Sequence, residues 1–232
     1  DTEVIVHLYE EVGLDVFARL NGMFAIAIWD AREQRLVIAR DRLGQKPLFY
    51  CDQGDRLTFA SELKSIVTLK DIVREIDPHA LDAYLTYQYV PHPMTIYRGI
   101  SKLSPGCYAT WKAGHLDIQS YWSPDFNEED TVTDEAEWSE RLEALLTDSV
   151  RLRMQSEVPL GAFLSGGIDS SIIVGLMQEQ STNQVHTFSI GFPIKEYDET
   201  HYARSVARHL GVLHEEFIVE PKALEVLPEM VW

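Results

Sequence analysis

The sequence predicts two consecutive domains of different fold class, an α+β domain in the first half of the chain and an α/β domain in the second. In the first half, short β segments come in pairs joined by polar turns, which is typical of antiparallel hairpins. In the second half, strands and helices alternate, which predicts a parallel sheet with right-handed crossovers. The expected boundaries are 1–122 for the first domain, 123–133 for an acidic linker and 134–232 for the second domain.

The composition is that of an ordinary globular protein: 45% of the 232 residues are hydrophobic and 25% are charged, and the length suits one large or two small domains. A net charge of −17 leaves no basic stripe and argues against nucleic-acid partners. No apolar stretch is long enough to span a membrane. Cys51 and Cys107 lie far apart without metal-ligand spacing, so a reducing, cytoplasmic setting is expected. Because the chain begins at Asp1 rather than Met, we expect it to be a fragment.

The first half begins with a helix expected at 3–12, which Gly13 would end. A short helix is expected from Glu62. Asp77-Pro78 is a helix-start signal, with the aspartate as N-cap and the proline at the first helical position. Three hairpins complete this half, and their strands are expected at 24–29 with 35–40, 47–51 with 57–60, and 107–111 with 116–121.

Two charged segments are better explained by structure than by binding. Arg40, Arg42 and Lys46 surround Asp41 near a hairpin turn, and a local ion-pair network is favoured there over a phosphate site. Between 124 and 140 there is no Lys or Arg while Asp and Glu accumulate, which favours a solvated linker running into a helix start over an acidic binding site.

A long helix is expected beyond this linker. Asp134, followed three residues later by Glu137, is a capping-box pattern. The apolar residues that follow recur at helical spacing and predict the buried stripe of the helix: Trp138, Leu142, Leu145, Leu146 and Leu152.

Strands and helices alternate in the rest of the chain. The apolar run 159–164 predicts a strand buried on both faces. Leu164 and Ile190 end two strands and would meet at the edge where parallel sheets bind ligands. Backbone groups there could hold an adenine, although packing alone would also explain both residues. The remaining elements are expected to be helices at 168–180 and 199–210, the latter ended by Gly211, and strands at 185–190 and 215–219.

The segment Ser165-Gly166-Gly167-Ile168-Asp169-Ser170-Ser171, between the first strand and helix of this half, has the features of a phosphate loop. The glycines allow a sharp turn and close approach to a ligand, and the N–H groups of Ser170 and Ser171 would be unpaired helix-start donors that favour an anion. No lysine follows, so the loop is not of the Walker type. With Asp169 on the loop, a bound phosphate would need a metal, and Mg²⁺ fits. The alternative is a plain Gly-Gly turn with Asp169 as an ordinary helix cap, which the order of the residues disfavours.

The segment 165–171 resembles the pyrophosphatase loop of the N-type ATP pyrophosphatases, which split ATP into AMP and pyrophosphate. In the first half, three segments resemble the class II glutamine amidotransferase domain of glutamine-dependent asparagine synthetases: 21–25, 39–50 and 59–64. Two further segments, 103–106 and 159–161, resemble the same family around the domain junction. The resemblance covers essentially the whole chain. It implies a truncated Ntn-type β-sandwich amidotransferase domain followed by a truncated parallel-sheet ATP pyrophosphatase (PP-loop) domain.

The resemblance also implies site residues. Asp1 is similar to the carboxylate that holds the α-ammonium group of glutamine, with a terminal helix cap as the alternative, and 197–199 is similar to a stretch near the nucleotide cleft. No residue matches the N-terminal cysteine that hydrolyses glutamine, so no catalytic residue is assigned and the chain by itself is expected to be inactive. The implied ATP-binding residues, with Asp169 also on Mg²⁺, are Leu164, Ser165, Gly166, Gly167, Asp169, Ser170, Ser171 and Ile190.

The implied reaction is the ATP-dependent adenylation of the aspartate β-carboxylate, followed by amidation with ammonia derived from glutamine. Glutamine, aspartate and ATP are then the substrates, a cytoplasmic location and a homodimer are expected, and neither nucleic acid nor membrane is a partner. One alternative is a relative that adenylates another carboxylate, such as a β-lactam synthetase or a polysaccharide-modifying amidotransferase. Another is a non-catalytic interaction protein, against which the intact phosphate loop argues.

Overall fold

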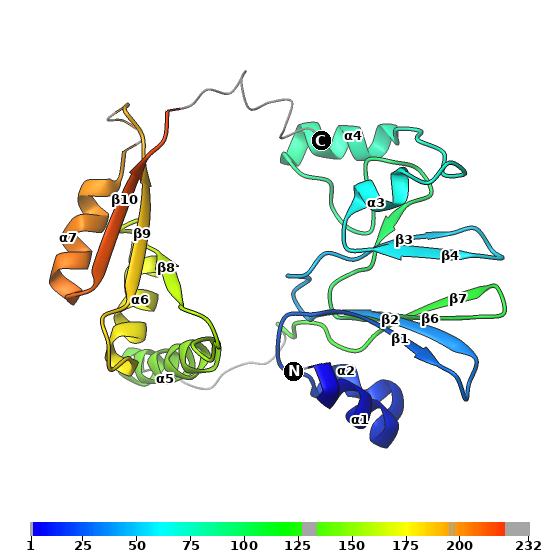
Figure 1. The fold of residues 1–232 in the computed structure, drawn as a ribbon, viewed down its shortest axis with the longest axis horizontal. Coiled ribbons are helices and arrows are strands. Elements are labelled where there is room, and N and C mark those ends of the chain that lie inside the picture. The colour runs from blue at the N-terminus through cyan, green and yellow to red at the C-terminus, as the bar shows by residue number, and fades with distance from the viewer. Residues whose placement is uncertain (1, 127–133, 195, 197, 221–232) are drawn as a thin grey trace. The chain divides into compact units, whose positions relative to one another are not determined.

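In the computed structural model, which describes residues 2–126, 134–194, 196 and 198–220, the chain divides into two units, Asp1–Glu128 and Glu129–Trp232. Figure 1 shows antiparallel hairpins in the first unit and alternating strands and helices in the second. The predicted combination of an α+β half and an α/β half with a parallel sheet is therefore confirmed.

The three predicted hairpins of the first unit are present and form two antiparallel sheets. One sheet has the order β1-β2-β6-β7, with β1 at Ala25–Asp30, β2 at Arg35–Arg40, β6 at Cys107–Lys112 and β7 at His115–Ser120. The other has the order β4-β3-β5, with β3 at Phe49–Asp52, β4 at Leu57–Ala60 and β5 at Ser101–Lys102. The strand β5 has only two residues and was not predicted, because so short a segment has no periodicity to reveal it.

The helices of this unit begin and end largely where the sequence signals lie. The backbone of Gly13 has φ +62°, and the Asp77 side chain accepts a hydrogen bond from the His79 N–H, so the expected helix stop and N-cap are both confirmed. Beyond Gly13 the chain nevertheless continues into a 3-10 turn and a further helix that the sequence did not indicate. The helical segments are α1 at Thr2–Val12, the 3-10 turn Gly13–Asp15, α2 at Val16–Arg19, α3 at Leu63–Val67 and α4 at Pro78–Tyr87.

The core of the first unit explains this extra helix. Phe17 is fully buried and packs with Val16 against Val37 and Tyr108, so α2 is held in place by the sheet rather than by local propensity. Burying a side chain of this size contributes about 1.5–3 kcal/mol. On the other face of β2, Ile38 packs in a cluster that also includes side chains of the second sheet. The two sheets of the unit therefore share a core.

The charged cluster near Asp41 is organised differently from the prediction. The Asp41 carboxylate is 1% exposed and accepts hydrogen bonds from backbone N–H groups, those of Gln45 and Lys46 at 2.9 Å. The Arg40 guanidinium donates to the backbone carbonyls of Gly44, Lys46 and Leu103 at 2.6–2.8 Å. The expected ion-pair network is thus wrong, because the charges of Asp41, Arg40 and Arg42 are paired with backbone groups.

The second unit contains the predicted parallel sheet, in the order β10-β9-β8. The central strand β9 pairs in parallel with β8 on one side and β10 on the other, and a helix connects each pair of strands. The elements are α5 at Glu135–Arg153, β8 at Gly161–Phe163, α6 at Ile168–Gln180, β9 at His186–Gly191, α7 at Thr200–Leu210 and β10 at Leu213–Ile218.

Within the described residues, helices cover only one face of this sheet. Leu164 and Val174 form one buried cluster with Ala203 and Ala207 of α7. On the opposite face Phe163 is 77% exposed, and Ile190 and Phe217 are each 51% exposed. Within the second unit, the expectation that 159–164 is a strand buried on both faces is therefore wrong: its alternate side chains face a surface that no described element of this unit covers.

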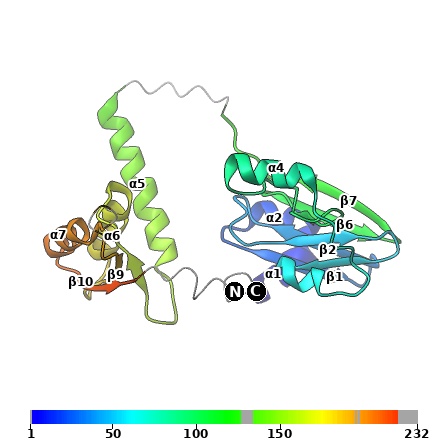
Figure 2. The same cartoon turned by 90° about the horizontal axis from the view of Figure 1, so that it is seen from above.

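The helix α5 begins where the sequence predicted, but its apolar side chains pack differently from the prediction. Asp134 accepts a hydrogen bond from the Ala136 N–H, which confirms the N-cap, and Glu137 pairs with Arg141 at 2.6 Å. The predicted apolar stripe is largely exposed, since α6 is shorter than α5 and contacts only its C-terminal half (Figure 2). Of the stripe, Leu146 packs in the core beside Val150, whereas four members are exposed: Trp138, Leu142, Leu145 and Leu152. None of the helices in the described residues could cross a membrane.

Candidate nucleotide site

The candidate site lies where the chain leaves β8 and enters α6, at the carboxyl edge of the parallel sheet. Leu164, the last residue before the loop, is buried, and its N–H donates to the carbonyl of Phe188 at 2.9 Å, which extends the pairing with β9 by one residue. This is the edge at which ligands of parallel sheets bind. The loop 165–167 is therefore anchored at one end by the sheet and at the other by the first turn of α6.

The start of α6 presents unpaired N–H groups. Among the described residues, nothing accepts a hydrogen bond from the N–H of Ile168, Asp169 or Ser170, whereas the N–H of Ser171 donates to the carbonyl of Gly167 at 3.0 Å. The prediction was right for Ser170 and wrong for Ser171, because the amide of Ser171 already makes the first bond of the helix. Three successive helix-start donors form a favourable environment for an anion.

The hydroxyls of the loop surround these donors. The Ser165 and Ser170 oxygens lie 3.0 Å apart, and the hydroxyls of Ser170 and Ser171 donate to the Gly167 carbonyl at 3.2 and 2.7 Å. Ser165 is exposed and also accepts a hydrogen bond from the Gly167 N–H at 3.3 Å. The loop is thus ordered by its own hydroxyls while three main-chain donors remain available.

The two glycines of the loop have different roles. Gly166 has φ +82°, and a Cβ there would lie 2.5 Å from the backbone nitrogen of Ala203 in α7. Gly167 has φ −72°, and a Cβ there would meet only the Ser165 hydroxyl, at 3.4 Å. The expectation was that both glycines serve close approach to a ligand. At Gly166 the close approach is to the backbone of α7, so the glycine is required by packing.

Asp169 is free to bind a ligand. Its side chain is exposed and makes no hydrogen bond or ion pair with any of the described residues, and the residue before the helix is Gly167. The alternative of an ordinary capping aspartate is therefore excluded. Within the described parts of the chain no group of three or more His, Cys, Asp or Glu could hold a metal. A single carboxylate beside unpaired amides is nevertheless a donor set that would suit Mg²⁺ if phosphate oxygens completed its shell.

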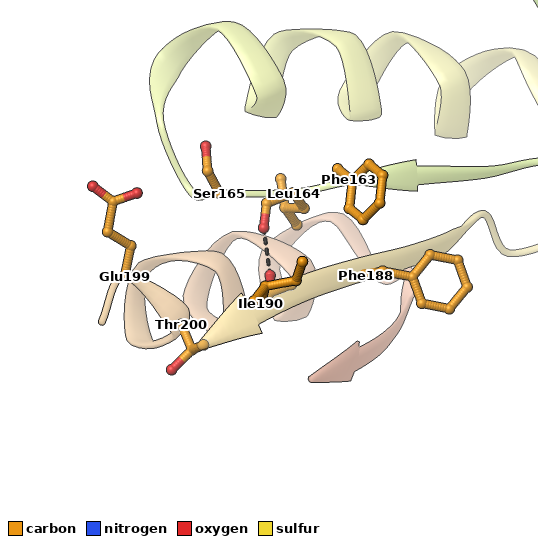
Figure 3. A pocket seen from close by; sticks show the side chains of 8 residues that line it. Phe163, Leu164, Ser165, Phe188, Ile190, Glu199 and Thr200 are labelled. Carbon is orange, nitrogen blue, oxygen red and sulfur yellow. Dashed lines mark hydrogen bonds between the residues drawn. The ribbon is translucent and has the colours of Figure 1, made fainter. Parts of the chain in front are cut away.

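A cavity of about 210 Å³ opens next to the loop (Figure 3). It is smaller than the roughly 300–1,000 Å³ usual for a site that encloses a drug-sized ligand, so it suits one part of a nucleotide. Leu164, Ser165 and Ile190, all predicted site residues, line it. Five further lining residues were not assigned as binding residues from the sequence: Phe163, Phe188, Ser189, Glu199 and Thr200.

The segment before α7 contributes one residue to this cavity. Glu199 lines it, as the resemblance of 197–199 to a cleft stretch suggested. Asp198 instead accepts hydrogen bonds from the Thr200 hydroxyl and N–H at 3.1 and 3.3 Å, which hold the pKa of Asp198 below its ordinary value. Asp198 thus stabilises the start of α7, and Tyr197 lies outside the described residues.

The predicted glutamine-binding residue belongs to the first unit. Asp1 lies outside the described residues, so its predicted role stays a prediction. Cys51 is buried and Cys107 is partly buried, both are free thiols, and burial raises the pKa of each. Neither thiol therefore has the lowered pKa that an activated nucleophile needs.

Comparison with known proteins assigns the two halves separately. A family model described as a glutamine amidotransferase domain matches residues 1–122, and one described as asparagine synthase matches residues 141–232. Among solved structures, an NMN synthetase from Francisella tularensis covers 43% of this chain and 41% of its own, with 19% identity and a TM-score of 0.31, a likeness too weak to support an argument.

Three curated relatives match nearly the entire chain. A putative asparagine synthetase [glutamine-hydrolyzing] 2 from Methanocaldococcus jannaschii is 37% identical, with 98% of this chain and 44% of the relative covered. Asparagine synthetase [glutamine-hydrolyzing] 1 of Bacillus subtilis is 36% identical, and a putative asparagine synthetase [glutamine-hydrolyzing] of Mycobacterium tuberculosis is 38% identical; each match covers 100% of this chain and 36% of the relative. The chain thus spans between a third and a half of the length of these relatives. With both halves matched in the same order, the chain belongs to the family of glutamine-hydrolysing asparagine synthetases.

Proposed function

We propose that this chain is part of an enzyme that makes asparagine from aspartate, ATP and glutamine. The observation that carries the proposal is the set of three unpaired N–H groups at 168–170, with the unpartnered Asp169 carboxylate among them, beside a cavity at the sheet edge. This arrangement supports binding of a nucleoside triphosphate. The printed names of the curated relatives support asparagine as the product.

We assign the phosphates and the base of the nucleotide to different residues of the second unit. The phosphates lie over the N–H groups of 168–170 and the hydroxyl of Ser165, and the base enters the cavity between Leu164 and Ile190. Asp169 would hold one Mg²⁺, which supplies positive charge to the phosphate oxygens. The amides are fixed before the reaction and therefore stabilise negative charge without reorganising.

The proposed bonds formed and broken are those of an asparagine synthetase, the name that the curated relatives carry. A β-carboxylate oxygen of aspartate attacks the α-phosphorus of ATP, and pyrophosphate leaves with its charge stabilised at the helix start. Ammonia then attacks the acyl carbon, the nitrogen loses a proton to solvent, and AMP leaves with the electron pair of the broken C–O bond. We propose glutamine as the source of the ammonia, and we assign the binding of its α-ammonium group to Asp1.

The first unit is proposed to be the amidotransferase half, of Ntn-type β-sandwich architecture. The core that its two sheets share, through Ile38 and Ala109 on one side and Leu48 and Tyr50 on the other, supports this assignment. A cytoplasmic location belongs to the same proposal and is supported by the two free thiols, Cys51 and Cys107. Assembly as a homodimer stays a prediction.

The substitution Asp169→Ala in the full-length protein tests the proposal. Aspartate-dependent exchange between ATP and pyrophosphate should fall by roughly 100-fold or more, the scale of losing one electrostatic stabiliser, while glutaminase activity is kept. Glu179→Ala, which removes an exposed carboxylate from the same helix, is the matched control and should leave exchange unchanged. Exchange that survives Asp169→Ala would refute the metal role of this residue. Wild-type exchange that depends on another carboxylic acid and not on aspartate would instead favour a β-lactam synthetase-like or polysaccharide-modifying relative.

A further inference from the structure

We propose, on the basis of the nucleotide site described above, that Ser189 is a positioning residue for the phosphate loop. Ser189 lies on the central strand β9, one residue before Ile190, and is 5% exposed. Its hydroxyl donates a hydrogen bond to the carbonyl of Leu164, the residue from which the loop departs, and Figure 3 draws this bond as the dashed line at Leu164. No sequence signal marks this serine, because its importance depends on the strand that lies beside it.

This hydrogen bond completes the attachment of β8 to β9. The Leu164 N–H donates to the Phe188 carbonyl, and no backbone N–H of the described residues donates to the Leu164 carbonyl. The Ser189 hydroxyl occupies the place where a further backbone bond between the strands would stand. Both polar backbone groups of Leu164 are therefore fixed to β9, immediately before the chain turns toward the unpaired amides of α6.

His214 of β10 supports Ser189 from the other side. Its side chain is 8% exposed, its Nδ1 lies 2.9 Å from the Thr187 hydroxyl and its Nε2 lies 3.4 Å from the Ser189 hydroxyl. The Thr187 hydroxyl also donates a hydrogen bond to the carbonyl of Leu213 at 2.9 Å, so its oxygen is held from two sides. The imidazole thus spans both hydroxyls of β9 and limits where the Ser189 oxygen can move.

The helix α7 also holds the loop, through its own contacts. Nε2 of His214 lies 3.6 Å from Glu216, and Glu216 accepts two hydrogen bonds from Arg204 of α7 at 2.8 and 2.5 Å. The backbone of α7 packs against Gly166 closely enough to exclude a Cβ. Ser189 therefore fixes the entry to the loop, and α7 fixes the side of the loop. The loop is held independently of any ligand, so its donors are preorganised.

A positioning role for Ser189 predicts a specific effect on the kinetics with ATP. Without the Ser189 hydroxyl, the Leu164 carbonyl loses its partner and the start of the loop can shift relative to the cavity that Leu164 and Ile190 line. ATP binding should weaken by about fivefold, the scale of one net hydrogen bond. The substitution removes none of the groups assigned to the phosphates, so the turnover at saturating ATP should change much less than the KM for ATP.

The experiment compares Ser189→Ala and Ser189→Thr in the full-length protein, by aspartate-dependent ATP–pyrophosphate exchange and by thermal unfolding. Ser189→Ala should raise the KM for ATP about fivefold with an unchanged KM for aspartate, and Ser189→Thr, which keeps the hydroxyl, should restore it. Thr95→Val is the matched control: it removes an equally buried hydroxyl, bonded to the carbonyls of Tyr97 and Ile100 in the first unit, and should lower Tm without changing the KM for ATP.

The outcomes separate this inference from the proposed function. Wild-type protein that shows no exchange would overturn the proposed function itself. Normal wild-type exchange together with an unchanged KM for ATP in Ser189→Ala would overturn the role of Ser189 alone, as would an equal rise in Thr95→Val. If Ser189→Ala does not fold, Ser189→Cys, whose thiol is a weaker donor of similar size, should give an intermediate KM, and a wild-type KM in that variant would contradict the inference.

Discussion

Gly166 and Gly167 are adjacent in the sequence, but the structure requires a glycine only at the first. At Gly166 both the positive φ and the backbone of α7 exclude a side chain, whereas Gly167 has an ordinary φ and open space beside it. A Gly-Gly pair therefore need not mean that both residues serve the ligand. The fold itself uses the first to bring α7 against the loop.

The substitutions Gly166→Ala and Gly167→Ala should accordingly differ. Gly166→Ala should reduce the free energy of unfolding by about 2–4 kcal/mol, from left-handed backbone strain and steric overlap together. Gly167→Ala should change it by no more than about 0.5 kcal/mol, the range of an unstrained surface position. Urea unfolding of both variants measures the difference, and similar losses in the two would show that α7 is not what demands the glycine.

Tyr121 makes the stability of the first unit depend on pH in the alkaline range. Its hydroxyl donates to the Arg40 carbonyl at 2.7 Å, and burial, followed by the nearby Asp41 charge, raises the pKa of Tyr121 from 10.0 to about 12. Because the folded state holds this proton more tightly than the unfolded state, the contribution of Tyr121 to stability is fully present below pH 10 and is lost as the pH rises toward 12.

Tyr121→Phe tests this dependence. At pH 8 the variant should be less stable by about 1 kcal/mol, through loss of one hydrogen bond. Between pH 10 and pH 12 the wild type should lose stability more steeply than the variant, so the two unfolding free energies should converge. Denaturant unfolding at several pH values measures this, and a constant difference up to pH 12 would disprove the assigned titration.

At the scale of the element, helix starts were the best-defined features of the sequence. Asp77-Pro78 and Asp134 both begin helices where expected, because a cap needs only a side chain and an N–H two residues away. The packing of a helix was less predictable. The stripe of α5 follows a helical period over its full length, yet α6 covers only the part around Leu146 and Val150.

The cap of α4 can be measured by comparing two aspartates of this region. Asp77→Ala removes the side chain that accepts the His79 N–H and should cost about 1 kcal/mol. Asp82→Ala removes the same charge from an exposed position within α4 and should change stability by no more than about 0.5 kcal/mol. Thermal unfolding followed by circular dichroism distinguishes the two, and equal effects would point to net charge rather than capping.

At the scale of the whole molecule, the described elements of the second unit leave one face of its parallel sheet open. Phe163, Ile190 and Phe217 are exposed there, and the rings of Phe188 and Phe217 stack with their centroids 6.3 Å apart. Parallel sheets are normally covered on both faces. An uncovered apolar face of this kind is expected to bind hydrophobic probes.

The 232-residue chain should therefore bind the dye ANS through this face. The double substitution Phe163→Ser and Phe217→Ser should lower the fluorescence of the bound dye, because it removes two of the exposed apolar groups. Val73→Ser, which changes a side chain of the first unit that is 70% exposed, should leave the fluorescence nearly unchanged. Equal effects of the two changes would indicate that the dye binds elsewhere.

The sequence by itself determined the hairpins, the parallel second half, the caps at Asp77 and Asp134, and the glycine loop that leads from the first strand of the parallel sheet into a helix. These features follow from turn residues, alternation and helix-start signals, all of which act over a few neighbouring residues. Only the tertiary structure decided that α2 folds beneath the first sheet, that Asp41 is held by backbone amides, that one face of the second sheet is open, and that Ser189 holds Leu164. Each of these depends on which distant segments meet, and burial and hydrogen bonding across such contacts leave no periodic trace along the chain.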